Sequence, residues 1–444
     1  MNHVKLINKF LCSLIILSSL TACKSNVSNG YSEHPLFPLD SEWLVNNSSS
    51  VKNGVYYYDS SKAENGVTLL NLMTRSILID MNGKVLEKFP IGLPKILPDG
   101  SIVGLMGPDL VKFDSDMSLI WKTPVVAHHE ITADDNGAIY LLSNESHEFM
   151  GVTAIFDVLK IFSSEGDLIY EWHVYEHLKE FISIISKSSY LSNLHTPYDS
   201  TQSIENYISQ DPKKFFYHIG KDTAKCVFEF THFNSIQVLP ENDVSKKITA
   251  FKKGNLLLSF NPYSCYGILD TTTGNIEWTG YLPERTSLHT PLLTSKGTIL
   301  VFQNSTGSSY WNSKQDALCL RYLNQTIPAR KPSKEPDSRL WVSITEYDPL
   351  TNTKVWEYTA TPKEAMQAGG LGSAERLPNG NTLICTATEI EGKGGEVFEV
   401  TSEKKLVWQY VSPEKDIQHN FPWAFYRANR ISFKIAKKMI PGIK

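Results

Sequence analysis

Cysteine is scarce in this sequence, and its charges are nearly balanced. Six cysteines occur among 444 residues, and no two of them are separated by two residues, which argues against a zinc site or a thioredoxin-type redox site. The net charge is -4, so the chain lacks the positive excess with which proteins bind nucleic acid. The chain can still form a large hydrophobic core, because 41% of its residues are hydrophobic.

Long hydrophobic runs are missing as well, apart from a short one near the N-terminus. Lys5 and Lys9 precede an apolar run over residues 11–20, which is too short to cross a bilayer as a helix. A basic segment, a short apolar run and small residues before a cleavage point are typical of a secretory signal peptide. Here the small residues Thr21 and Ala22 come directly before Cys23, which resembles a bacterial lipobox.

This pattern predicts a signal peptide over residues 1–22 and lipidation of the Cys23 thiol after cleavage. Residues 23–53 would then be a lipidated linker to the folded part. Lys24 rather than aspartate follows the cysteine, and by analogy with lipoprotein sorting in Gram-negative bacteria this favours the outer membrane. We therefore expect an envelope lipoprotein that faces the periplasm and contacts the membrane through its anchor.

Four cysteines remain after the predicted cleavage. An oxidising compartment permits disulfides, but four cysteines allow three pairings and the sequence leaves all three open. These residues are Cys226, Cys265, Cys319 and Cys385.

One unit recurs along the rest of the chain: a leading residue, a turn and a short β run. In four copies the turn glycine lies eight residues after the leading residue, and in a fifth copy the turn comes two residues later. A hairpin that ends near a tryptophan follows each of these five β runs. A sixth hairpin, from Leu78, has no tryptophan and precedes the first unit. The leading residues are Gly92, His129, His232, His289 and Gly372, and the tryptophans are Trp121, Trp172, Trp278, Trp356 and Trp408.

Short strands, regular turns and a repeated aromatic residue are typical of β-propeller blades. Five complete units and one N-terminal hairpin predict an all-β, six-bladed propeller over residues 54–434, with a tail over 435–444. We expect the ring to close when a strand from the C-terminal segment pairs with the blade around residues 68–86.

The innermost strand of a propeller blade begins at the central channel, so the leading residues of all blades face the same space. Three of the five are histidine, although the whole chain has only 12. Each histidine alone could be a satisfied polar residue at a blade edge, but three in one position favour a shared site. Between Trp172 and His232 lies a long insertion, about residues 174–228, with helical spacing and a possible second helix over 201–219. It either caps the channel mouth or is a surface excursion.

Several segments, in this order, resemble the bacterial arylsulfotransferase family. The resemblance implies a six-bladed propeller that moves a sulfuryl group from an aryl sulfate to a phenol without a nucleotide donor or a cofactor. It covers residues 54 to 430, in GVYYYDSSKAENGVTLL, LIDMNGKVLEKF, HHEI, HFNSI, GSAERLPNGNTLIC, FEVTSEKKLVWQYVSP and NFPWAFYRANRI.

The resemblance also implies which residues are catalytic. The family's channel histidines correspond to His129, His232 and His289, and the one that becomes sulfated corresponds best to His289, although its flanking residues depart from the family pattern. Neutral imidazole is a competent nucleophile, and a second histidine can protonate the leaving phenolate. Three histidines could also bind a metal, but their spacing gives no support, and we predict none.

One departure concerns the arginine that the family places after the second histidine. In the matching run, LLLSFNPYS, Asn261 stands at that position, and asparagine carries no charge. Losing one charged donor to the transition state costs ~10²–10³ in rate. Arg285 is a candidate substitute, and His128, beside His129, is a third candidate substrate-binding residue.

Two alternatives remain at this point. The first is a non-catalytic propeller of the same descent that binds an aromatic anion or an envelope partner protein. The second is a quinoprotein-type dehydrogenase, suggested by YDPLTNTKVW and LDTTTGNIEW, which resemble tryptophan-docking repeats. The second alternative gives the leading histidines no role, and the sequence lacks adjacent cysteines.

Overall fold

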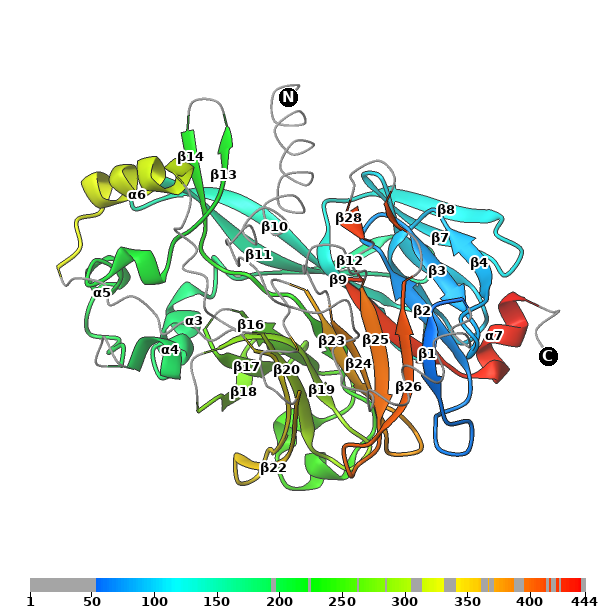
Figure 1. Cartoon of the computed structure of the whole chain (residues 1–444). Helices are drawn as coiled ribbons and strands as arrows, with labels where there is room; N and C mark the ends of the chain where they lie inside the picture. Colours follow the sequence, from blue (N-terminus) through cyan, green and yellow to red (C-terminus); the bar gives the residue numbers. More distant parts are fainter. Residues whose placement is uncertain are drawn as a thin grey trace.

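The computed structural model describes residues 53–440, except for 193–196, 223–224, 262, 284–285, 305–313, 331–340, 361–365, 367–370, 387–394, 413–414, 417–420 and 423–424. Within this part, six sheets surround one axis, so the chain is the six-bladed β-propeller that the repeat predicts (Figure 1). The predicted signal peptide, Cys23 and Arg285 lie outside the described residues.

The strands of blades 2 to 6 follow one another from the axis to the rim, and the innermost strands of these five blades contact each other in succession. Blade 1 differs, because its innermost strand comes from the C-terminal end of the chain. Blades 1, 2 and 3 contain β29 (Arg427–Ile431), β2 (Val67–Asn71), β3 (Ser76–Ile79) and β4 (Val85–Phe89); β5 (Gly92–Ile96), β6 (Ile102–Met106), β7 (Asp109–Phe113) and β8 (Leu119–Pro124); and β9 (His128–Ala133), β10 (Ile139–Phe149), β11 (Val152–Phe162) and β12 (Leu168–His173).

The other three blades have the same order. Blades 4, 5 and 6 contain β15 (Ile236–Val238), β16 (Leu256–Phe260), β17 (Cys265–Leu269) and β18 (Ile276–Tyr281); β19 (Ser287–Leu293), β20 (Ile299–Asn304), β21 (Ser343–Asp348) and β22 (Thr353–Thr359); and β23 (Ser373–Arg376), β24 (Thr382–Thr386), β25 (Glu396–Val400) and β26 (Leu406–Val411).

Both ends of the described chain close the ring. Strand β29 pairs with β2, with Arg427 opposite Asn71, which confirms the predicted closure by a C-terminal strand. In addition, β1 (Val55–Tyr58) pairs with β26 as a fifth strand of blade 6. Helix α7 (Phe433–Met439) then buries Ala436 and Met439 against blades 1 and 2, and a short pair, β27 (Lys415–Asp416) and β28 (Phe421–Pro422), precedes β29.

The turns explain the aspartates and glycines of the repeat. In the turn of blade 3, the carboxylate of Asp134 accepts the backbone N–H groups of Asn136 and Ala138, each at 2.9 Å. Gly137 has φ 84°, a left-handed conformation that costs a side-chain-bearing residue free energy. The turn therefore holds β9 and β10 in register without any help from the histidines before it.

The repeated tryptophans join neighbouring blades. The indole N–H of Trp408 in blade 6 donates to the carbonyl of Met81 in blade 1 at 2.9 Å. Three other blades make the same contact with the next blade, and Trp278 instead packs edge-to-face on Phe251. The three contacts are Trp121 to Ser164, Trp172 to Gly274 and Trp356 to Ser402. A buried indole needs a hydrogen-bond acceptor, and here the next blade supplies it.

The insertion begins as helices and ends as a hairpin. Helices α3 (Leu178–Ile185), α4 (Ser189–Ser192) and α5 (Ile204–Ile208) and the turn η2 (Pro212–Lys214) precede β13 (Tyr217–Asp222) and β14 (Lys225–Glu229). The second helix predicted over 201–219 is therefore wrong beyond Ile208, because the chain returns to blade 3, where β14 pairs in parallel with β11. Helix α3 packs along the flank of blade 4, where Glu180 accepts the backbone N–H of Ile276.

One of the cysteine pairings left open by the sequence is present. Cys226 in β14 forms a disulfide with Cys319 in helix α6 (Lys314–Thr326), so the hairpin of the insertion is tied to a segment that lies between β20 and β21 of blade 5 in the sequence. Cys265 and Cys385 are buried free thiols.

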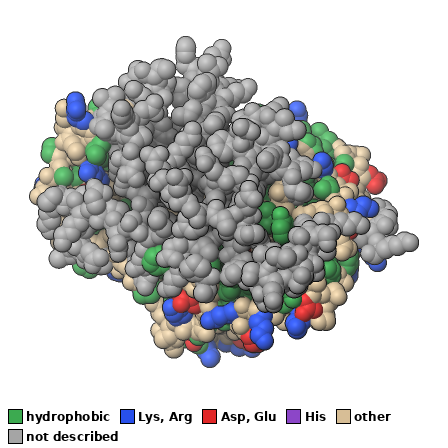
Figure 2. Space-filling model, viewed as in Figure 1, with side chains coloured by type: hydrophobic (Ala, Val, Ile, Leu, Met, Phe, Trp, Pro, Cys, Tyr) green, Lys and Arg blue, Asp and Glu red, His purple; other side chains and the backbone are tan. Residues whose placement is uncertain are grey.

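Part of the described surface is mixed in charge. On the face shown in Figure 2, lysine, arginine, aspartate and glutamate side chains are intermixed along the lower edge. Among the described helices, none has both the length and the apolar character needed to cross a membrane. The 3₁₀ turns η3 (Asp243–Lys246) and η4 (Thr249–Phe251) lie in the long hairpin behind β15.

Candidate active site

The innermost strands of blades 2, 3 and 5 share an irregularity at the channel end. The pairing register shifts between Gly92 and Lys95, beside His128, and between His289 and Leu292. At these bulges Leu93, His129 and Thr290 have φ of 49°, 58° and 44°, a left-handed backbone that is rare outside glycine. Strain of this kind is concentrated at functional sites, where the surrounding fold over-determines it.

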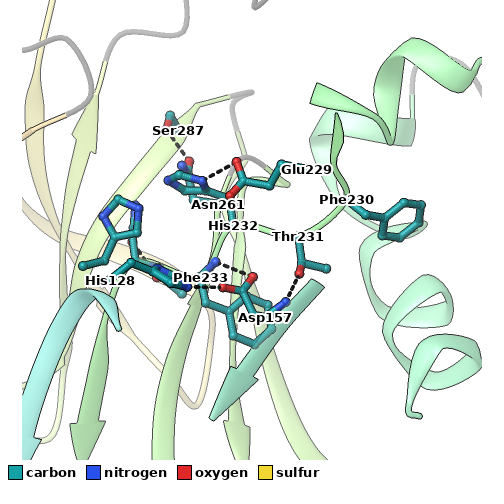
Figure 3. A network of polar contacts seen from close by, with 12 residues as sticks. His128, Asp157, Glu229, Phe230, Thr231, His232, Phe233, Asn261 and Ser287 are labelled. Carbon is teal, nitrogen blue, oxygen red and sulfur yellow. Dashed lines mark hydrogen bonds and ion pairs between the residues drawn. The ribbon is translucent and has the colours of Figure 1, made fainter. Parts of the chain in front are cut away.

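His128 and His129 are adjacent in β9 but have different surroundings. The Nε2 atom of His128 lies 3.1 Å from the carboxylate of Asp157 in β11 and 3.0 Å from the carbonyl oxygen of Ser143. Both acceptors occupy one ring nitrogen, so His128 is anchored in its own blade. Asp157 also accepts the backbone N–H of Phe233, which fixes the residue next to His232 (Figure 3).

His129 lies in the cluster that the repeat predicts. Its ring centroid is 4.5 Å from that of His232, and its Nδ1 is 2.8 Å from the hydroxyl of Tyr426. Burial holds the pKa of His129 well below its usual 6.5, and the neighbouring His232, His128 and His289 lower it further. His129 is therefore neutral near pH 7.

His232 has the opposite character. Its Nδ1 lies 2.7 Å from the carboxylate of Glu229, the last residue of the insertion hairpin (Figure 3). Burial lowers the pKa of His232, but the negative charge of Glu229 and its hydrogen bond outweigh burial, so the net pKa is raised above 6.5. His232 is thus the histidine of the cluster best suited to donate a proton.

His289 is oriented by an amide. Its Nδ1 contacts the side-chain oxygen of Asn304, whose amide nitrogen donates to the carbonyl of Leu371 at 3.1 Å. Because the amide is held with its oxygen toward the ring, Nδ1 carries the proton and the lone pair is on Nε2. His289 also lies close enough to lower the pKa of His129 electrostatically, so the three predicted histidines come together.

Asn261 lies beside these histidines, but its side-chain oxygen is used to hold the start of β19. It pairs with His232 as an isolated bridge between neighbouring segments. Its side-chain oxygen accepts the hydroxyl of Ser287 and the backbone N–H of Leu288, the latter at 3.2 Å. This side chain therefore fixes the start of β19, immediately before His289.

Arg427, which opens β29 in blade 1, is a further candidate residue that the sequence repeat does not indicate. This residue occupies the position that the histidines occupy in their blades, at the channel end of the innermost strand. Its guanidinium contacts Glu130 of blade 3 and the backbone carbonyl of Asn234 at the start of blade 4. The repeat could not show it, because β29 has no hairpin behind it in the sequence; the pairing with β2 supplies the rest of the blade.

Metal binding finds no support in the described part of the chain. Among these residues, no group of three or more histidine, cysteine, aspartate or glutamate side chains has the geometry to hold a metal ion. The carboxylates near the cluster each face a histidine or an arginine instead.

Comparison with known proteins identifies one family. Residues 110–413 match the arylsulfotransferase (ASST) family. No curated protein matches the chain.

The solved structures that match the chain are remote in sequence. A protein of unknown function from Bacteroides caccae is 11% identical (82% of this chain and 98% of that chain, TM-score 0.44). The β-propeller domain of Cps50 (Swd1) from Myceliophteria thermophila is 10% identical (80% and 88%, TM-score 0.40), and hydrazine synthase from Kuenenia stuttgartiensis is 8% identical (74% and 67%, TM-score 0.38). The match to the family covers more than half of the chain, with the histidine cluster inside it: this protein belongs to the arylsulfotransferase family.

Proposed function

We propose that this protein transfers a sulfuryl group from an aryl sulfate to a phenol through a sulfohistidine at His289, without a nucleotide donor. The observation that supports this most is the convergence of three imidazoles with different protonation. His289 has its lone pair on Nε2, His232 beside Glu229 is the proton donor, and His129 is neutral.

In the first half-reaction, Nε2 of His289 attacks the sulfur atom and the bond from sulfur to the aryl oxygen breaks. The leaving phenolate takes the proton of His232, and such general acid catalysis contributes ~10²–10⁴ in rate. In the second half-reaction, neutral His232 accepts the proton of the incoming phenol, whose oxygen attacks sulfur. The bond from sulfur to nitrogen breaks, and the starting enzyme is restored.

In this scheme His129 positions the sulfuryl group and transfers no proton. Its neutral ring lies against His232, and Tyr426 holds its Nδ1. Burial raises the pKa of Tyr426 to about 12, so this phenol stays protonated and a neutral pair of rings lines one side of the site.

The test is to incubate the purified mature protein with 4-nitrophenyl sulfate, with and without phenol. We expect release of 4-nitrophenolate that depends on phenol, with phenyl sulfate formed in equal amount. Release that is absent in a well-folded protein would contradict the proposal and leave the non-catalytic alternative, a propeller that binds an aromatic anion. The specific observation behind that alternative is Asn261, whose side-chain oxygen is committed to Ser287 and Leu288.

A further inference from the structure

The histidine cluster as described so far lacks a fixed positive charge. A sulfuryl group in transfer carries negative charge on three oxygens, and a planar guanidinium matches such oxygens well. Asn261 is uncharged, and its oxygen is used to hold β19. Within the part of the chain that the structure describes, a cation for these oxygens has to come from another element of the propeller.

We propose that Arg427, at the start of the closing strand β29, binds the sulfuryl oxygens of the aryl sulfate. This role rests on the sulfuryl transfer proposed above. The guanidinium would donate hydrogen bonds as the group moves from oxygen to Nε2 of His289, and it forms no covalent bond itself.

The direction in which Arg427 reaches distinguishes it from the other buried arginines. Arg376 pairs with Glu346 between blades 6 and 5, and Arg430 pairs with Glu399 between blades 1 and 6. Both of these pairs join neighbouring blades, and each guanidinium stacks on a blade tryptophan, Trp356 or Trp408. They are structural contacts of the kind that the repeat produces.

Arg427 instead reaches past blade 2. Its partners are Glu130 in blade 3 and the carbonyl of Asn234 at the start of blade 4. An arginine on blade 1 can contact both only if its guanidinium lies across the channel. The neighbouring Tyr426 makes the same crossing to His129.

The donors of Arg427 are not all used. Its side chain is 10% exposed, and among the described atoms its buried Nε–H has no hydrogen-bond partner. The Nε2 atom of His129 is also buried without a partner in this part of the chain. Both residues line one small cavity, together with Glu130, Leu93 and Asn429. Because both residues line this cavity, their unpartnered nitrogens suggest a polar occupant there.

Glu130 is the residue that holds Arg427 in place. The ion pair and the contact with Asn234 fix two corners of the guanidinium, so the remaining donors are oriented before substrate binds. Burial lowers the pKa of Arg427, but the negative charge of Glu130 outweighs burial, so the net pKa is raised and the guanidinium stays charged.

The experiment measures binding of 4-toluenesulfonate to the full mature protein by calorimetry. A sulfonate has the three oxygens of the sulfuryl group, but its sulfur is bonded to carbon and cannot be transferred. We expect R427Q to weaken binding about 10-fold or more, since hydrogen bonds to a charged partner are lost. Binding of neutral benzenesulfonamide should change much less.

Removing Arg427 alone leaves Glu130 buried without its partner and could unfold the protein. The double variant E130Q/R427Q removes both charges, and the matched pair E346Q/R376Q does the same between blades 5 and 6. We expect E130Q/R427Q to fold and still bind the sulfonate about 10-fold more weakly, and E346Q/R376Q to bind within about 2-fold of the wild type. If E130Q/R427Q binds like the wild type, or if the wild type binds no sulfonate, the assignment of Arg427 is wrong. Sulfonate binding that depends on Arg427, in a protein that transfers no sulfuryl group, would refute the transferase and leave the anion site.

Discussion

Glu229 holds the Nδ1 of His232 at 2.7 Å, although the two residues belong to different elements. Glu229 ends the hairpin of the insertion, whereas His232 leads into blade 4. The disulfide at Cys226 fixes the same strand three residues earlier. An insertion outside the propeller repeat thus sets the protonation of a residue in the histidine cluster.

The first prediction follows from this pair. Donor cleavage needs protonated His232, so the rate of 4-nitrophenolate release should fall as pH rises through the raised pKa of His232. E229Q keeps an acceptor atom but removes the charge, so the fall should begin at lower pH. The measurement is the pH profile of single-turnover phenolate release.

A matched control is E145Q, because Glu145 also faces two histidines, His147 at 3.0 Å and His173 at 3.1 Å, but outside the cluster. Its pH profile should equal that of the wild type. If E229Q and E145Q give the same profile, Glu229 does not control the proton donor.

The second prediction concerns the nucleophile. H289A should lose both half-reactions, by about 10³-fold or more, because no other group in the scheme forms a bond to sulfur. H129A should slow transfer by less, since His129 only positions the group. Rapid-quench measurement of the phenolate burst tests this, with H147A as a control histidine outside the cluster. A full burst in H289A would mean that the nucleophile is another residue.

The third prediction concerns Asn261. N261R introduces the charge that the family pattern has at this position, but it breaks the contacts with Ser287 and Leu288 and brings a second guanidinium to the site. We expect slower transfer and a lower melting temperature. A faster rate in N261R would show that the site lacks a cation, and it would contradict the role given to Arg427.

The fourth prediction concerns the membrane. We propose that the mature protein begins at a lipidated Cys23 and is held at the outer membrane, facing the periplasm. C23A should abolish lipidation, and the protein should be released from envelope membranes or remain uncleaved. Mass spectrometry of the N-terminus and membrane fractionation measure this. A soluble protein that retains residues 1–22 in the wild type would rule out the anchor.

The fifth prediction concerns the contacts between blades. Trp408 is fully buried and donates to the carbonyl of Met81, so W408F leaves a buried acceptor unsatisfied. The free energy of unfolding should fall by about 1–3 kcal/mol. W356F removes the equivalent bond to Ser402 at an exposed position, where water replaces it, and should cost less. Equal losses in the two variants, measured by denaturant unfolding, would mean that this bond does not stabilise the ring.

The propeller and the three histidines could be predicted from the sequence, because both follow a local repeat. Each blade needs its own turn, such as the one around Gly137, and its own leading residue, so spacing along the chain reports them directly. The resemblance also predicted the family, which the match over residues 110–413 confirms.

The surroundings of those histidines could not be predicted from the repeat, because they depend on the folded ring. Glu229, Asn304 and Arg427 reach the cluster from an insertion hairpin, the second strand of a blade and the closing strand, positions that have no common spacing. The same holds for the disulfide between Cys226 and Cys319, 93 residues apart. Protonation of an imidazole depends on burial and on charges a few ångströms away, and these distances exist only once the ring has closed.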